Sequence, residues 1–124
     1  MDQIEKIVQE LKEDKNINAI YLFGSYATGR QKKYSDIDIC LITKTQDKKE
    51  NLKYYGFSSK KIDISIFDRL PLQAKYKVFK EGIILHLKDK DKIEECKRKT
   101  IEKYLEQKPF FDRQLKHLLD KKAV

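Results

Sequence analysis

The chain has 124 residues, 40% of them apolar and 39% charged, a balance typical of one soluble folded domain rather than a disordered tail. Its 28 Lys and Arg against 20 Asp and Glu give a net charge of +8, which favours anionic partners such as nucleotides, nucleic acid or an acidic protein. No apolar run approaches the ~18 residues of a membrane span, and the N-terminal segment is amphipathic rather than a signal core. We therefore expect a cytoplasmic protein without membrane contact.

The first half of the chain predicts a helix followed by two strands. Apolar residues recur every three or four positions in residues 2–14, which indicates an amphipathic helix. Residues 19–23 form a short apolar run that Gly24 ends, which indicates a buried strand. Residues 35–42 alternate in a two-residue period and predict a second strand. The polar stretch 44–55 has room for a short helix.

The second half continues the alternation. Residues 62–67 predict a third strand, residues 71–81 a helix that stops before a glycine, and residues 83–87 a fourth strand. From about residue 89 onward apolar residues keep a helical spacing on both sides of Pro109, so we expect two terminal helices or one kinked helix.

This order of elements predicts an α/β fold. We expect a mixed sheet of about four strands with helices on one side and C-terminal helices. No repeat, low-complexity tract or linker divides the sequence, so we expect a single domain over residues 1–124, with the C-terminal helices beginning at about residue 89.

Acidic residues on the second and third predicted strands suggest a metal site. Asp36 and Asp38 alternate on one strand face with α-carbons ~6.6 Å apart, so both carboxylates can reach the same cation. Magnesium usually binds one or two protein carboxylates, several waters and substrate phosphates. Asp63, at the start of the third strand, would add a third carboxylate, so two magnesium ions could be held. One ion would help to activate an attacking hydroxyl and the other would stabilise a leaving pyrophosphate, with Asp63 as metal ligand or base.

A glycine-serine turn precedes these carboxylates by ten residues (26–35). Gly24 lets the backbone approach a ligand closely, Ser25 offers a hydroxyl, and amides at the start of a following helix would face a triphosphate. Arg30 adds a candidate positive charge for the phosphates. We therefore expect ATP or a similar nucleotide to bind beside this turn.

Each feature also has a plainer interpretation. Asp36 and Asp38 could be the solvent face of an amphipathic strand, Gly24 and Ser25 a simple turn, and Arg30 a solvated loop charge. The combination favours chemistry, because aspartate is disfavoured inside strands and three aspartates occur beside this turn. The histidines and cysteines have no partners at metal-ligand spacing, so we expect packing or surface roles for His86, His117, Cys40 and Cys96. We expect the same of Tyr54, Tyr55 and Tyr104, for which contact with a nucleotide base is left open.

The motif Gly24-Ser25, ten residues, then Asp36-Ile37-Asp38 resembles the signature of the minimal nucleotidyltransferases (MNT) of the DNA polymerase β superfamily. Ile62-Asp63-Ile64 is similar to the third acidic strand of that family, and residues 80–85 to its glycine-led last strand. The resemblance implies a polymerase-β-like nucleotidyltransferase fold and a magnesium-dependent enzyme.

Residues 101–119, with Tyr104 ahead of Lys108-Pro109-Phe110, resemble the terminal helices of MNT-type antitoxins that are paired with HEPN ribonuclease toxins. This resemblance implies transfer of AMP from ATP to a tyrosine of a separate HEPN-type toxin. Three alternatives stay open: neutralisation of the partner by occlusion, transfer to a small molecule, and transfer to an RNA end. Direct nucleic-acid binding is not expected, because no aromatic residues are interleaved with Lys and Arg, while a homo-oligomer through the terminal helices is possible.

Overall fold

The computed structural model describes residues 2–32 and 36–122. Its centre is a four-stranded sheet in the order β3-β2-β1-β4, with β1 (Ile17–Phe23), β2 (Ile37–Thr43), β3 (Ile62–Ile66) and β4 (Ile83–Leu87). Strand β1 pairs antiparallel with β2 and β4, whereas β2 and β3 are parallel. The predicted mixed sheet of four strands is therefore confirmed, and Ser35, where the second strand was expected to begin, lies outside the described residues.

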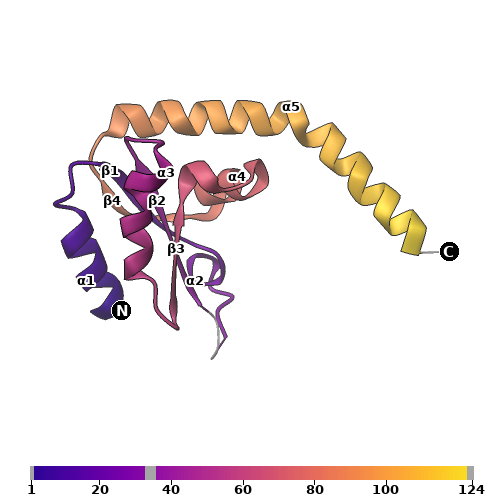
Figure 1. The fold of residues 1–124 in the computed structure, drawn as a ribbon. Helices are drawn as coiled ribbons and strands as arrows, with labels where there is room; N and C mark the ends of the chain where they lie inside the picture. Colours follow the sequence, from indigo (N-terminus) through magenta and orange to yellow (C-terminus); the bar gives the residue numbers. More distant parts are fainter. Residues whose placement is uncertain (1, 33–35, 123–124) are drawn as a thin grey trace.

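The connections between the strands are helical. They are α1 (Asp2–Leu11), α2 (Ser25–Thr28), α3 (Lys48–Asn51), the 3-10 helices η1 (Leu52–Phe57) and η2 (Phe67–Arg69), α4 (Leu72–Glu81) and α5 (Lys90–Lys122). The sequence left open whether the terminal segment is two helices or one, and the structure shows one helix that contains Pro109. Figure 1 shows α5 changing direction partway along its length and leaving the sheet. Proline lacks an N–H and its ring crowds the carbonyl four residues earlier, which accounts for such a bend.

Helices cover both faces of the sheet, so the prediction of helices on one side is wrong in this respect. One face packs against α1 and η1, and the other against α4 and α5 (Figure 1). The physical reason is that β1 and β2 are buried at nearly every position, because the side chains that alternate to each face are apolar. The polar residues of β2 are Asp38 near its start and Thr43 at its end, and the apolar residues between them need cover on both sides.

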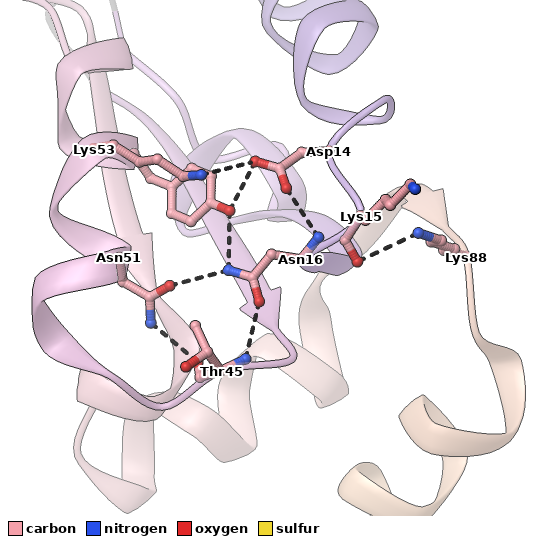
Figure 2. Close-up of polar contacts among 8 residues, drawn as sticks. Asp14, Lys15, Asn16, Thr45, Asn51, Lys53 and Lys88 are labelled. Carbon is pink, nitrogen blue, oxygen red and sulfur yellow. Dashed lines mark hydrogen bonds and ion pairs between the residues drawn. The ribbon is translucent and has the colours of Figure 1, made fainter.

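The end of the sheet at which β1 begins is closed by a hydrogen-bond network around Asn16 (Figure 2). The Asn16 amide nitrogen donates to the Tyr54 hydroxyl at 3.0 Å and to Asn51 Oδ1 at 3.3 Å, while its oxygen accepts from the Thr45 backbone N–H at 2.9 Å. The Tyr54 hydroxyl in turn donates to Asp14 Oδ2 at 2.8 Å. Burial raises the pKa of Tyr54 to about 12, so this hydroxyl keeps its proton and serves as a donor.

The network also sets the charge state of Asp14. Burial alone would raise the pKa of this carboxyl, but hydrogen bonds from the Asn16 backbone N–H and the Tyr54 hydroxyl, with the charge of Lys53, lower it below its usual value. These polar groups satisfy one another at the point where three chain segments meet, so the start of β1 is fixed to the loop after β2 and to η1.

In the described part of the chain, no helix has the length and apolar content needed to cross a membrane. The cytoplasmic location expected from the sequence stays a prediction.

Candidate active site

The turn after β1 is shaped by glycine. Gly24 has φ 74° and ψ −152°, and Gly29, which ends the single turn of α2, has φ 73°. A β-carbon at Gly24 would collide with Oδ2 of Asp38, whereas a β-carbon at Gly29 would meet nothing within 4 Å. Gly24 is therefore required twice, for its backbone conformation and for the carboxylate that lies against it.

The strand register brings the predicted carboxylates to this turn. Phe23, the last residue of β1, pairs with Asp38 on β2, and Asp38 pairs with Asp63 on β3. Because adjacent strands lie ~4.8 Å apart, the side chains of Asp38 and Asp63 are direct neighbours. Asp36 precedes β2 by one residue and is exposed, as is Asp63, whereas Asp38 is half-buried. The structure thus gathers three aspartates from two strands beside Gly24.

The three aspartates of this group repel one another electrostatically. Burial raises the pKa of Asp38, and the neighbouring charges of Asp63 and then Asp36 raise it further. Among the ion pairs formed within residues 2–32 and 36–122, none includes these three carboxylates. A half-buried carboxylate with like charges beside it is suited to bind a cation.

The carboxylates are not a preformed metal cage. Across the described ranges, no group of three or more His, Cys, Asp or Glu side chains converges closely enough to enclose an ion. Their oxygen atoms nonetheless fit magnesium, which keeps several waters and shares its coordination between a few carboxylates and substrate phosphates. Asp36, Asp38 and Asp63 are the residues that could hold it.

A pocket of about 320 Å³ adjoins the carboxylates. One wall is the turn after β1, including Gly24, Ser25 and Arg30, which the sequence predicted as phosphate-binding residues. The other wall is α4, which contributes the side chains Ala74, Lys77 and Glu81. The sequence did not single out this second wall. Its only signal was the spacing of three and four residues along a helix, which many solvated helix faces share.

Phe23 at the end of β1 lines this pocket, whereas Tyr54, Tyr104 and His86 do not. Tyr54 belongs to the Asn16 network, and Tyr104 stacks on Tyr76 with ring centroids 3.8 Å apart, which holds α5 against α4. His86 is half-buried, and burial followed by the charges of Lys12 and Lys88 lowers its pKa. Packing roles agree with these positions.

Two curated proteins of Methanocaldococcus jannaschii are similar to this chain in sequence. "Putative protein adenylyltransferase MJ1547" is 44% identical over 66 residues, which cover 53% of this chain and 52% of that protein. "Putative protein adenylyltransferase MJ1215" is 53% identical over 36 residues, which cover 29% of this chain and 42% of that protein. The matches thus span about half the length of these curated relatives.

Solved structures share the fold. A chain from a crystal structure of a toxin-antitoxin with AMP-PNP superimposes on this chain with a TM-score of 0.68 at 24% identity, covering 92% of this chain and 97% of that one. A chain from a complex of tri-AMPylated Shewanella oneidensis HEPN toxin with MNT antitoxin gives a TM-score of 0.59 at 22% identity, covering 92% and 94%. At identities this low, the superpositions establish a shared fold alone.

The family itself is established by the sequence. The family model described as polymerase beta, nucleotidyltransferase matches residues 5–91, well over half of the chain. That range contains the glycine-serine turn, all three aspartates and the α4 wall of the pocket. The chain belongs to the polymerase beta nucleotidyltransferase family.

Proposed function

We propose that this chain, as one nucleotidyltransferase domain, transfers AMP from ATP to a tyrosine hydroxyl of a partner protein, and that the partner is a HEPN-type toxin which the transfer neutralises. The observation that carries the proposal is the meeting of Asp36, Asp38 and Asp63 beside Gly24, which also lines a pocket. Membership of the nucleotidyltransferase family supports the reaction class. The names of the relatives support a protein acceptor, and the toxin–antitoxin complexes with the same fold support the partner.

Each site residue has a role in this proposal. Asp36 and Asp38 would hold magnesium, with Asp63 completing a site for two ions, and bound magnesium would neutralise phosphate charge at the reacting centre. Gly24 gives the phosphates access to the backbone. Ser25 donates its hydroxyl to a phosphate oxygen, and its position in the pocket lining supports this role.

The transfer is a displacement at the α-phosphorus of ATP. The tyrosine oxygen forms a bond to that phosphorus while the bond to the oxygen bridging the β-phosphate breaks, so inorganic diphosphate leaves with the bonding electrons. The phenolic proton passes to the carboxylate of Asp63. Asp63 is exposed, so an acceptor side chain from another protein can reach it.

The distal part of α5 supplies a surface for a partner. It leaves the sheet in Figure 1, and the side chains with about half or more of their surface exposed include Leu105, Phe110, Leu115, Leu118 and Leu119. Such exposed apolar side chains are typical of interaction surfaces. The same observation favours a second candidate function, in which the chain neutralises its partner by occlusion and the carboxylates play a minor part.

Magnesium-dependent transfer of labelled AMP to the proteins of the host lysate tests the proposal. Wild type is compared with the double variant Asp36→Asn, Asp38→Asn, and with Asp91→Asn, Glu94→Gln, which removes two exposed carboxylates at the start of α5. We expect wild type and the control to label one protein and the site variant to label none, a loss on the order of 1,000-fold. If the site variant still neutralises the partner fully and no protein gains AMP, occlusion replaces catalysis as the function.

A further inference from the structure

The α4 wall of the pocket presents a lysine at a fixed position. Val78 and Phe79, the next two residues, are buried against the sheet, and the Phe79 ring packs edge-on against Tyr21 and Phe67 with centroids 5.6 and 5.2 Å apart. These contacts set the rotation of α4 about its axis. Lys77 is therefore held where it lines this pocket and also a second one beside Tyr104, and its own side chain is exposed.

The neighbouring lysines of α4 are engaged elsewhere. The Lys75 ammonium lies over the Phe67 ring, 5.4 Å from its centroid, and the Lys80 ammonium lies over the Tyr76 ring at 5.8 Å. Lys77 lines the pocket, and no ion pair that the described residues form includes it or Arg30.

A triphosphate in this pocket needs cationic side chains. The aspartates beside Gly24 repel it, and α2 has four residues, so few aligned peptide dipoles are available to offset that repulsion. Of the pocket-lining residues, Arg30 and Lys77 are the two that carry positive charge, one on each wall. Lysine acts on phosphate as a compact point charge with several donors, which suits a mobile phosphate chain.

The residues that line the pocket indicate which phosphates lie near Lys77. In the proposed reaction the α-phosphate lies by the carboxylates, next to Gly24, because the acceptor attacks there. Arg30 and Lys77 line the same pocket as Gly24, so the rest of the phosphate chain has these two cations to lie against. We propose, on the basis of the function proposed above, that Lys77 binds the β- and γ-phosphates and stabilises the negative charge that develops on the departing diphosphate.

This role has two consequences. Lys77 recognises a feature that all nucleoside triphosphates share, so it selects a triphosphate over AMP and does not select the base. Because charge on the leaving oxygen grows during the reaction, the interaction is stronger in the transition state, and Lys77 contributes to kcat as well as to binding.

Equilibrium binding of magnesium–ATP, inorganic diphosphate and AMP tests the proposal without an acceptor. We expect Lys77→Gln to weaken binding of ATP and of diphosphate by roughly 10- to 100-fold and to leave AMP binding unchanged. Lys77→Arg should restore most of the affinity. The matched control is Lys80→Gln, which removes the same charge from the same helix three residues away and should bind all three ligands as wild type does.

The outcomes separate this proposal from the function it rests on. Wild type that fails to bind ATP overturns both. If wild type binds ATP, three results overturn the role of Lys77 alone. They are an unchanged ATP affinity in Lys77→Gln, an equal loss of ATP affinity in Lys80→Gln, and a loss of AMP affinity in Lys77→Gln as large as its loss of ATP affinity. In transfer assays Lys77→Gln should raise KM for ATP and lower kcat while the melting temperature stays at the wild-type value, a combination that a purely structural role does not produce.

Discussion

Strand β1 joins two polar clusters that differ in how their charges and hydrogen bonds are met. At its start, the side chain of Asn16 has a partner for each polar atom, and hydrogen bonds lower the pKa of Asp14 against the effect of burial. At its other end, burial and like charges raise the pKa of Asp38, and the backbone of Gly24 adopts a positive φ. The seven-residue strand sets the two clusters roughly 23 Å apart.

In the function proposed above, one cluster serves stability and the other serves catalysis. The Asn16 cluster is complete by itself, so it stabilises the fold without any ligand. The Asp38 cluster is incomplete by itself, because a cation and a phosphate chain are what would satisfy it. A site that is costly when empty and favourable when filled is typical of catalytic centres, and the rest of the fold must offset that cost.

The largest effect is expected from Gly24→Ala. The substitution places a methyl group against the Asp38 carboxylate and forces a non-glycine residue into a positive φ. We expect transfer to fall by about 100-fold or more, since catalytic geometry tolerates little displacement, and the free energy of unfolding to fall by roughly 2–4 kcal/mol. Labelled-AMP transfer and urea unfolding measure the two effects.

Gly29→Ala is the matched control, because Gly29 has nearly the same φ but open space around its α-carbon. It should lower stability by about 1–2 kcal/mol and leave transfer near the wild-type level. Equal losses of transfer in both variants would mean that backbone strain in the turn, rather than contact with Asp38, explains the effect of Gly24→Ala.

A smaller effect is expected at the other end of the strand. Asn16→Ala removes the amide that links Tyr54, Asn51 and the Thr45 backbone, and we expect a loss of about 1–3 kcal/mol in the free energy of unfolding. Transfer under conditions where the variant is folded should be unchanged. Gln46→Ala, an exposed amide in the same loop, should be neutral. Loss of transfer in folded Asn16→Ala would contradict the separation of the two ends.

The sequence predicted the functional end better than the stabilising end. The two-residue period and the order of short strands were enough to place Asp36, Asp38 and Asp63 on neighbouring strands beside Gly24. The Asn16 network could not be predicted, because its side-chain bonds join residues 29 to 38 positions apart with no shared periodicity. Helices on both faces were missed because the aspartates at the start of β2 suggested a polar face.

The α4 wall of the pocket was missed for a different reason. Which of the lysines on that helix lines the pocket depends on how Val78 and Phe79 pack against the sheet, and the cluster that they join contains residues of β1, β2, η2 and α5. Composition compounds the difficulty, since 28 residues of this chain are Lys or Arg.

The smallest effect is a difference in how the two ends titrate. For Asp38, whose pKa is raised by folding, the ionised carboxylate destabilises the native state, and this penalty is present above the folded pKa and disappears below about pH 3.8. For Asp14, whose pKa is lowered, ionisation stabilises the native state above about pH 3.8, and the contribution is lost as pH falls through the folded pKa. Ionisation of these two carboxylates therefore has opposite effects on the stability of the native state.

Thermal unfolding of magnesium-free protein from pH 7 to pH 3.5 measures this opposition. At pH 7 Asp38→Asn should melt above wild type, on the order of a few degrees, and we expect it to lose transfer, whereas Asp14→Asn should melt below wild type. The Asp38 difference should shrink as the pH approaches 3.5, because protonation makes that carboxyl neutral like the asparagine that replaced it. The Asp14 difference should only begin to shrink there, because its lowered pKa keeps the native carboxyl ionised. If Asp38→Asn melts below wild type at pH 7, the carboxylate is already stabilised in the empty site, and the contrast between the two ends of β1 does not hold.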